Sequence, residues 1–361
     1  VKRNWDTILA VKTIANQLGI DSERIQIAGI KDAKAVTAQH ISISRTIPEQ
    51  VSQIKIKNIR LHPLRFLDDK IHSGMLFGNK FHITIKAIVH SSSKIEERTE
   101  NVQNELESFG GTPNFFGHQR FGTIRPVTHL VGKNLVRSEW EEAALTFLAK
   151  SSEYEHPESR QAREQLWKTE NFREALHYFP HKLGYERIML NHLAKYSRDF
   201  VGAFRRLPTK LLQLFVQAYQ SYLFNRFLSQ RIKLGIPLNE IQTGDQTMSV
   251  GSQKRLALPL IGFKQLLSSG VQGEIERQVL EKENVKPPNF HISTMPEISA
   301  AGGLRTAVVS INGFSMGKPS EDSANSFRRK LSLDFTLRSG SYATIVLREF
   351  MKPQYPIKAG F

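Results

Sequence analysis

The sequence predicts an α+β fold in which one lobe with a mostly antiparallel sheet is interrupted by a mainly helical insertion domain. Three observations support this prediction. Residues 1–150 alternate between strand-like and helix-like patterns, and residues 151–303 carry long helical patterns rich in charged side chains. Residues 304–361 return to the alternation of apolar and polar residues that is typical of strands. We therefore expect residues 1–150 and 304–361 to form one lobe around an insertion at 151–303.

The first elements of the chain surround a turn that contains Asp32. Asp6 can cap a helix that ends at Gly19, because the apolar residues between them recur at helical spacing. Short apolar patterns at 25–28 and 41–44 predict two strands, with Asp32 on the turn between them. A carboxylate that a strand end holds fixed and open to substrate is a common catalytic arrangement. An aspartate that hydrogen-bonds its own turn has the same spacing, so both interpretations stay open.

Further strands and one helix complete the predicted lobe. Phe81, Ile83 and Ile85 alternate with polar residues, which predicts a core strand over 81–86. The pattern over 102–109 is helical and ends at a Gly-Gly pair, which is a common helix stop. Three strands are expected near the end of the chain, at 306–311, 331–337 and 342–347.

The predicted insertion contains helices of two kinds. Residues 151–195 are rich in Glu, Arg, His and Lys, and predict helices on a solvated surface, for example over 170–178. Over 211–232 large apolar residues recur at helical spacing, which favours a core helix over a platform for stacking bases. These residues are Phe215, Tyr219, Tyr222, Leu223 and Phe227. Glycines within 241–251 mark the turns of a small β element.

Composition limits the classes of function. A chain of 361 residues exceeds one typical core, so two domains are expected. The formal net charge of +16 is spread along the chain, which fits a long polyanion better than one small anion, although a generally basic soluble protein is the alternative. The absence of cysteine excludes disulfides and thiolate metal sites and favours an intracellular, cytoplasmic location. No apolar run reaches the roughly 18 residues of a membrane span, and the first residues are unlike a signal peptide.

Three strings carry the most specific signal in the sequence. They are GIKDAKAVTAQHIS at 29–42, NFFGHQRFG at 114–122, and GSYAT at 340–344 followed by Arg348-Glu349-Phe350. In this order they resemble the G-x-K-D-x-x-A-x-T-x-Q, N-x-F-G-x-Q-R-F-G and G-S-[FY]-A-T…R-E signatures of the TruD family of RNA pseudouridine synthases. The resemblance implies that Asp32 is the essential catalytic residue and that the insertion splits the catalytic domain. It also implies a tRNA substrate, usually modified at uridine 13 in the D arm.

The implied reaction breaks the N1–C1′ bond of uridine, turns the uracil, and rejoins it through C5. Asp32 would act at C1′ as a nucleophile or at C2′ as a base, and the sequence leaves both roles open. Tyr342 would stack on the uracil at a position where bacterial family members carry Phe and other pseudouridine synthases generally use Tyr, and its hydroxyl could also transfer a proton. The alternative is a core aromatic in a strand. Asn114 and Phe116 would hold the uracil edge and face, unless Asn114 is only a turn residue after Pro113.

Several basic residues are candidates for binding the RNA backbone. Arg120 or Arg125 could reach phosphates, and so could Lys31, which faces away from Asp32 in an extended turn. Arg348 is predicted to lie in a strand, where a buried arginine needs a carboxylate, and Asp32 is the partner that we expect. The target uridine must leave its stack to reach such a site, so base flipping is expected.

No cofactor is expected, because the isomerisation neither oxidises nor consumes anything. The 12 histidines have no metal-ligand spacing, so no metal site is expected either. The expected partner is tRNA, and we assume a monomer. Family members carry an additional N-terminal segment, with an F-x-V-x-E strand and a lysine near the active site. This segment is not in the sequence, so we expect the catalytic site to be incomplete here.

Two other functions remain as alternatives. A non-catalytic RNA-binding protein of the same fold would need only the basic charge and the Phe-rich string, but it would not need Asp32. An RNA nuclease or glycosidase with Asp32 as a lone acid would usually need a second carboxylate or a metal, and no second acid lies near the three strings.

Overall fold

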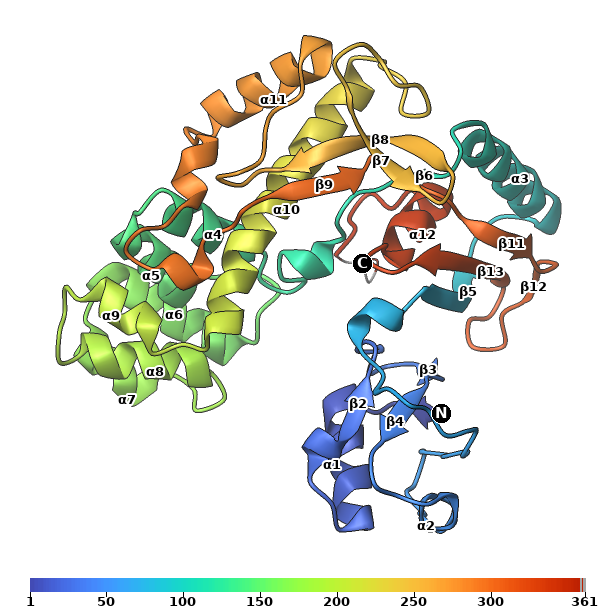
Figure 1. The fold of residues 1–361 in the computed structure, drawn as a ribbon, viewed down its shortest axis with the longest axis horizontal. Coiled ribbons are helices and arrows are strands. Elements are labelled where there is room, and N and C mark those ends of the chain that lie inside the picture. Colours follow the sequence, from blue (N-terminus) through green and yellow to red (C-terminus); the bar gives the residue numbers. More distant parts are fainter. Residues whose placement is uncertain (358, 360–361) are drawn as a thin grey trace. The chain divides into compact units, whose positions relative to one another are not determined.

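The computed structural model describes residues 1–357 and 359 of the chain. They form two compact units, Val1–Asn79 and Lys80–Phe361, whose helices and strands are labelled in Figure 1. Every strand pair with a recorded register is antiparallel, which confirms the predicted α+β class with mostly antiparallel sheets. Within the described residues, no helix combines the length and apolar character that crossing a membrane requires.

The first unit packs one main helix on short strands. Its helices and strands are β1 (Lys2–Arg3), α1 (Thr7–Leu18), β2 (Ile25–Ile27), β3 (Val36–Thr37), β4 (Ile41–Ile43) and α2 (Pro48–Ser52), with 3-10 turns at Ser22–Arg24 and Ser73–Met75. β2 pairs with β4, and β1 pairs with β3. The Asp6 side chain accepts a hydrogen bond from the Leu9 amide at 2.9 Å, and Gly19 ends α1 in the left-handed region, so the predicted helix is confirmed. Ile14 of α1 and Ile25 of β2 share the small apolar core of the unit.

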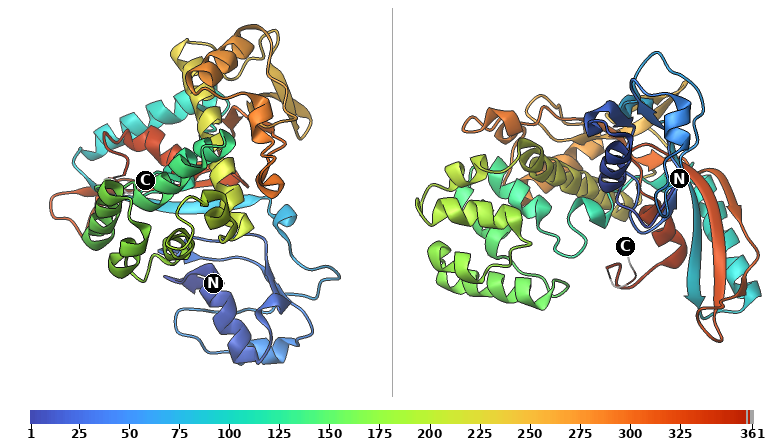
Figure 2. Two further views of the ribbon diagram at one scale, coloured as in Figure 1. Left: turned by 90° about the vertical axis from the view of Figure 1, so that its left-hand side faces the viewer. Right: turned by 90° about the horizontal axis from the view of Figure 1, so that it is seen from below.

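A four-stranded antiparallel sheet forms one part of the second unit. Its strands are β5 (Gly78–Ile88), β11 (Asn312–Met316), β12 (Ser320–Glu321) and β13 (Arg329–Arg338). β13 pairs with each of the other three, and the long β5 and β13 run side by side in Figure 2. Helices α3 (Ser92–Ser108) and α12 (Ala343–Met351) add Ile95 and Val346 to the core of this sheet. Phe81, Ile83 and Ile85 pack on the same core, which confirms the predicted strand.

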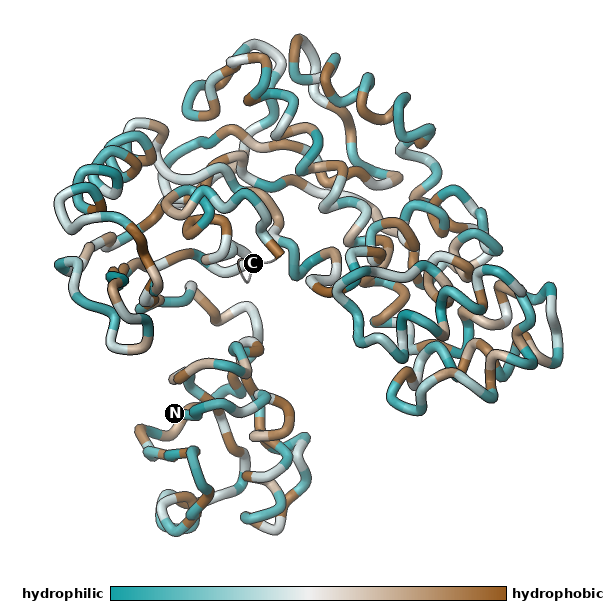
Figure 3. The backbone as a smooth tube through the Cα atoms, turned by 180° about the vertical axis from the view of Figure 1, so that it is seen from behind, coloured by the Kyte–Doolittle hydropathy of each residue, from teal (hydrophilic) through white to brown (hydrophobic). Residues whose placement is uncertain are grey.

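A helical body with a small sheet forms the rest of the second unit. Its helices are α4 (Thr128–Val136), α5 (Trp140–Ala149), α6 (Pro157–Thr169), α7 (Phe172–Tyr178), α8 (Gly184–Leu193), α9 (Phe200–Arg205), α10 (Thr209–Lys233) and α11 (Gly270–Lys282). Its antiparallel sheet has the order β7 (Gln246–Val250), β8 (Gln253–Leu260), β9 (Gly303–Thr306). Hydrophobic and hydrophilic residues alternate along the helices in Figure 3, as expected for helices with one buried face.

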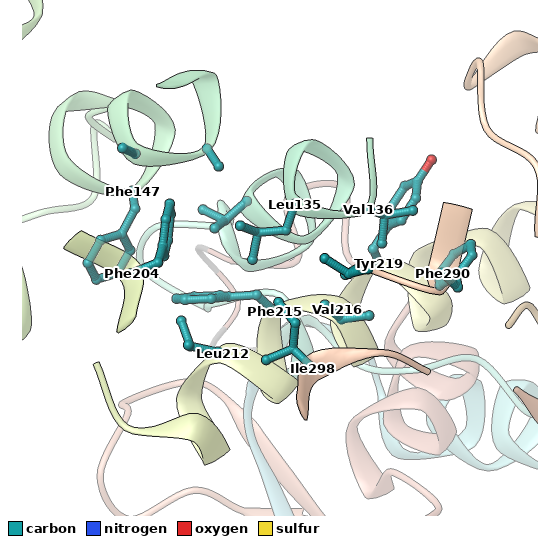
Figure 4. Close-up of a cluster of buried hydrophobic side chains, with 14 of the residues drawn as sticks. Leu135, Val136, Phe147, Phe204, Leu212, Phe215, Val216, Tyr219, Phe290 and Ile298 are labelled. Atoms are coloured by element: carbon teal, nitrogen blue, oxygen red, sulfur yellow. The ribbon is translucent and has the colours of Figure 1, made fainter. Parts of the chain in front are cut away.

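The core of this helical body confirms the prediction for 211–232. Phe215, Tyr219, Leu223 and Phe227 of α10 are all buried, and Figure 4 shows Phe215 and Tyr219 among side chains from α4, α5 and α9. The same apolar core contains residues of α4 and α5, which precede residue 151. The division of the chain at residues 150 and 303 stays a prediction.

Three other expectations need correction. Residues 342–347 are not a strand, since α12 begins at Ala343; Ala343, Val346 and Phe350 pack on the sheet core at helical spacing, which overrides the β-branched run Thr-Ile-Val. The helix predicted at 102–109 begins at Ser92, where Ser91 caps it. The helices within 151–195 are not only a solvated surface, because each also buries apolar side chains.

The expected strand at 306–311 is divided in two. β9 ends at Thr306, and β10 (Val308–Val309) then pairs with β6 (Thr112–Pro113). This short pairing places the second string, which starts at Asn114, beside the end of β9. Two segments about 190 residues apart in the sequence are thereby brought together.

Candidate active site

The turn that carries Asp32 is held through its main chain. We call residues 29–35, between β2 and β3, the Asp32 turn. The Lys2 ammonium donates hydrogen bonds to the carbonyl oxygens of Asp32 at 2.6 Å and Lys31 at 3.3 Å, and to that of Trp5 at 2.7 Å. The Thr7 hydroxyl donates to the Lys31 carbonyl at 2.9 Å, and the Lys31 amide donates to Thr7 Oγ1 at 3.0 Å. Hydrogen bonds therefore hold the peptide group between Lys31 and Asp32 and the main-chain atoms on either side of it.

The Asp32 side chain itself is exposed. Among the described residues its carboxylate has no hydrogen-bond partner, so the alternative of an aspartate that bonds its own turn has no side-chain contact to support it. A carboxylate with a fixed backbone and free oxygen atoms can approach a substrate without first breaking a protein contact.

Lys2 is the residue of this unit that sequence reasoning missed. Only 6% of it is exposed, and the three acceptors of its ammonium are neutral carbonyl oxygens. Burial lowers the pKa of Lys2, and the nearby carboxylates of Asp32 and Asp6 oppose that shift. A lysine at the second position of the sequence shows no pattern that marks it as buried, since two of its three acceptors come from the turn about 30 residues later.

Lys31 has its own partner within the first unit. Its side chain is partly buried, and its ammonium donates a hydrogen bond to the Asn79 side-chain oxygen. Burial lowers the pKa of Lys31, while Asp32 raises it. A contact between Lys31 and an RNA phosphate stays a prediction.

The second unit gathers residues of the second and third strings into one cluster. We call Asn114, Phe116, Arg120, Arg305 and Tyr342 the Arg305 cluster. Asn114 is only 5% exposed, and its side-chain amide donates to the carbonyl and hydroxyl oxygens of Thr306 at 2.9 and 3.1 Å. Its side-chain oxygen accepts a hydrogen bond from Arg305. Asn114 is thus held by β9, and its contact with a uracil edge stays a prediction.

Arg305, on β9, fastens the cluster, and no sequence pattern identified it. Its guanidinium also donates to the carbonyl oxygens of Asn114 and Gly340, each at 3.1 Å. Its central carbon lies 4.1 Å from the centroid of the Phe116 ring, within the range of a cation–π contact. Burial lowers the pKa of Arg305 to about 10, and Tyr342 opposes the shift. In the part of the chain that the structure describes, the hydrogen-bond acceptors of Arg305 are all neutral oxygen atoms.

Phe116 and Tyr342 lie next to each other. Their ring centroids are 6.1 Å apart, at an interplanar angle of 64°. The Phe116 backbone is held by the Asn225 side chain of α10, which accepts from the Phe116 amide at 2.9 Å and donates to its carbonyl at 3.0 Å. A Cβ atom on Gly117 would lie only 2.9 Å from the Tyr342 ring, so the glycine permits this approach. The structure therefore brings residues of the second and third strings together.

Arg120 adds a second guanidinium to the cluster. It donates to Ser221 Oγ and Gln217 Oε1 of α10, each at 3.2 Å, and lies 5.9 Å from the Phe116 ring centroid. Burial lowers its pKa, and Tyr342 opposes the shift. Two cations and two aromatic rings in one place suit a nucleotide, which carries both negative charge and a flat ring.

Arg125 is not available for phosphates. Its guanidinium lies 3.6 and 3.7 Å from the carboxylates of Glu155 and Glu186, and it donates to the carbonyl oxygen of Phe147 at 3.0 Å. Only 12% of its side chain is exposed. The basic loop predicted around it is instead part of a buried ion-pair network, which Arg163 completes.

Arg348 lies on helix α12 and not in a strand. Its charge is close enough to His118 to lower the pKa of that histidine, although burial is the larger cause. The prediction of a buried strand arginine is therefore wrong, whereas its pairing with Asp32 stays a prediction. Among the described residues, no group of three His, Asp or Glu side chains gathers in a way that could hold a metal ion.

Comparisons with known proteins agree with the three strings. Residues 1–350 match the family model described as tRNA pseudouridine synthase D (TruD). A protein from Methanosarcina barkeri named "Probable tRNA pseudouridine synthase D" is 38% identical over 379 residues, covering 98% of this chain and 86% of that protein. A Methanopyrus kandleri protein with the same name is 41% identical over 354 residues, covering 97% of this chain and 84% of that protein. A crystal structure from Methanosarcina mazei, titled "Putative tRNA pseudouridine synthase D (TruD)", matches with a TM-score of 0.87 at 38% identity. The match covers 99% of this chain and 87% of that chain.

Proposed function

Because the chain belongs to the TruD family of tRNA pseudouridine synthases, we propose that it converts one uridine of tRNA, uridine 13, to pseudouridine and that Asp32 is its catalytic residue. The observation that carries the role of Asp32 is its exposed carboxylate on a turn whose main chain is fixed by Lys2 and Thr7. The Arg305 cluster is the proposed binding site for the flipped nucleotide.

In the proposed reaction Asp32 acts on the ribose of the flipped uridine. Either its carboxylate attacks C1′ as the N1–C1′ bond breaks, or it takes a proton from C2′ so that the uracil leaves as an anion. The uracil then turns, and C5 bonds to C1′. In the first route this bond displaces the Asp32 carboxylate from C1′; in the second, Asp32 returns its proton to C2′. C5 finally loses its proton and N1 gains one, so that product and substrate have the same composition. No oxidant, reductant or cofactor enters this balance.

The Arg305 cluster supplies the surface on which the uracil would turn. The Tyr342 and Phe116 rings can stack on the free base, and stacking retains a flat ring without fixing its rotation. The guanidiniums of Arg120 and Arg305 lie against Phe116 and would stabilise the negative charge of a departing uracil or of a neighbouring phosphate.

Loss of the C5 hydrogen offers a direct assay. A tRNA transcript labelled with tritium at C5 of its uridines should release label when it is incubated with the wild-type protein. The transcript in which uridine 13 is replaced by cytidine should release none. Asp32→Asn should release none from either transcript, whereas Asp68→Asn, which changes another exposed aspartate of the first unit, should match the wild type. Release by Asp32→Asn at the wild-type rate would refute the role of Asp32.

A further inference from the structure

A pocket of about 310 Å³ opens beside the first half of α10, next to the Arg305 cluster. One wall is the helix face that carries Gln213, Gln217 and Gln220, and the other is segment 298–302, which leads directly into β9. Val216, Leu260 and Ile298 contribute apolar lining, and Figure 4 shows Val216 and Ile298 close to each other.

A stripe of neutral polar side chains on α10 connects this pocket with the Arg305 cluster. Gln213, Gln217 and Ser221 are four residues apart, and Asn225 follows after another four, so all lie on one side of the helix. Gln217 and Ser221 hold Arg120, and Asn225 holds the Phe116 backbone. The helix that lines the pocket is therefore the same one that positions the predicted uridine-binding residues.

The lining of the pocket suits an uncharged flat ring with both hydrogen-bond donors and acceptors. The Gln213 and Gln220 amides donate to the carbonyl oxygens of Glu297 and Ile261, at 2.9 and 2.6 Å. Among the described residues their Oε1 atoms have no hydrogen-bond partner, and neither have the backbone N–H groups of Ala301 and Gly302. Of the residues that the structure describes, none with a charged side chain lines the pocket. Acceptors and donors over an apolar floor are what an unpaired nucleobase requires.

We propose that this α10 pocket binds the base of a second, unpaired nucleotide of the RNA, close in sequence to the uridine that is modified. The inference rests on the proposed function, because it takes the Arg305 cluster as the site of the target uridine. Gln217 and Asn225 are eight residues apart on α10, which corresponds to ~12 Å along the helix axis. That length matches roughly three to four stacked nucleotides at about 3.4 Å each. The second base therefore comes from within a few nucleotides of the target.

Filling the pocket tests this proposal. Ala301→Trp places a large side chain at an exposed position of the pocket wall. We expect it to raise the Kd and the KM for a transcribed tRNA by about 10-fold, the size of one lost base contact, and to leave kcat at saturating tRNA within about twofold. The matched control is Leu214→Trp, at a position of α10 that is exposed and does not line the pocket. It should leave Kd, KM and kcat unchanged.

Crosslinking identifies what occupies the pocket. With benzoylphenylalanine in place of Ala301, irradiation of the tRNA complex should produce an adduct at a nucleotide within a few positions of the modified uridine. An adduct at a distant nucleotide, or none, would overturn the proposal, as would wild-type binding by Ala301→Trp. If the wild-type protein binds tRNA but releases no tritium from C5, the proposed function fails. Loss of binding by Ala301→Trp would then still support a nucleotide site in the pocket.

Discussion

The Asp32 turn and the Arg305 cluster are held in opposite ways. In the turn, Lys2 and Thr7 bind main-chain atoms, and the Asp32 carboxylate is left exposed and without a partner among the described residues. In the cluster, the side chains of Asn114 and Arg305 bind each other and are buried or partly buried. The proposed reacting group is thus fixed through its backbone, whereas the proposed binding surface is fixed through the side chains that form it. Substitutions in the two regions should therefore differ in their effects on kcat, on tRNA binding and on stability.

Arg305→Met should have the largest combined effect on stability and activity. The substitution removes the donor from the Asn114 side-chain oxygen and from the carbonyl oxygens of Asn114 and Gly340. Unpaired buried oxygens should lower the free energy of unfolding of the second unit by about 2–4 kcal/mol. Displacement of Phe116 and Tyr342 should reduce kcat/KM by about 100-fold. Thermal unfolding and tritium release measure the two effects.

Arg206→Met provides the control for this substitution, since Arg206 is exposed and its side chain has no hydrogen-bond partner among the described residues. It should leave both quantities close to the wild-type values. Wild-type stability and activity for Arg305→Met would show that the cluster does not depend on its central arginine.

Lys2→Met should affect chemistry more than binding. Three carbonyl oxygens lose their donor, which should cost about 1–3 kcal/mol of stability in the first unit. The Asp32 turn would then move, and kcat should fall by about 10- to 100-fold with little change in KM, because the proposed tRNA-binding residues of the second unit are unchanged. Hydrogen exchange of the amides at 29–35 should accelerate. Lys12→Met, at an exposed position of α1, should change none of these measurements.

Substitutions of Tyr342 test how much its aromatic ring contributes to activity. Tyr342→Phe keeps the ring beside Phe116, so activity should stay within about threefold of the wild type if stacking is the main role. Tyr342→Ala removes the ring and should reduce kcat/KM by about 10-fold or more. A large loss with Tyr342→Phe would instead identify the hydroxyl as a proton carrier. Tyr185→Ala, at an exposed position on α8, is the matched control.

A last prediction concerns stability alone, which should depend on pH in the second unit through His129. His129 stacks on Tyr222 with ring centroids 4.9 Å apart, and burial, assisted by Lys150, lowers its pKa to about 4. Because the unfolded chain binds this proton more readily, the stabilisation is present above pH 6.5 and is lost as the pH falls toward 4. Unfolding of the second unit should therefore need about 2 kcal/mol less at pH 5 than at pH 7.

Hydrogen exchange can follow the two units separately in urea at these pH values. In His129→Gln the part of the pH dependence that His129 contributes should disappear. An unchanged pH profile in that variant would mean that other groups cause the acid sensitivity of the second unit.

Local patterns in the sequence predicted much of the fold. Helix α1, strand β5 and the buried face of α10 follow from residues close together in the chain, because capping, alternation and helical spacing are local signals. The segment after Tyr342 was misassigned because its β-branched residues favour a strand, whereas packing on the sheet core makes it a helix.

The residues that hold the Asp32 turn and the Arg305 cluster were harder to predict than the candidate site residues themselves. Asp32, Asn114, Phe116 and Tyr342 stand in recognisable strings, but the partners of Asn114 lie about 190 residues later. Lys2 and Arg305 are buried cations that bind neutral oxygens, and only tertiary packing reveals such positions. A search for basic residues beside predicted strand ends would have included Arg305, which precedes the strand expected at 306–311, but not Lys2.

The most direct test of the account compares tRNA binding and conversion in Asp32→Asn. The turn is held through its main chain, and the carboxylate has no partner among the residues that the structure describes. The variant should therefore bind the transcript with a Kd within about twofold of wild type and unfold at the same temperature. In a single turnover with excess protein, its conversion of uridine should be slower by about 1,000-fold or more. Conversion at a rate near that of the wild type would contradict the account, and so would loss of folding together with loss of activity.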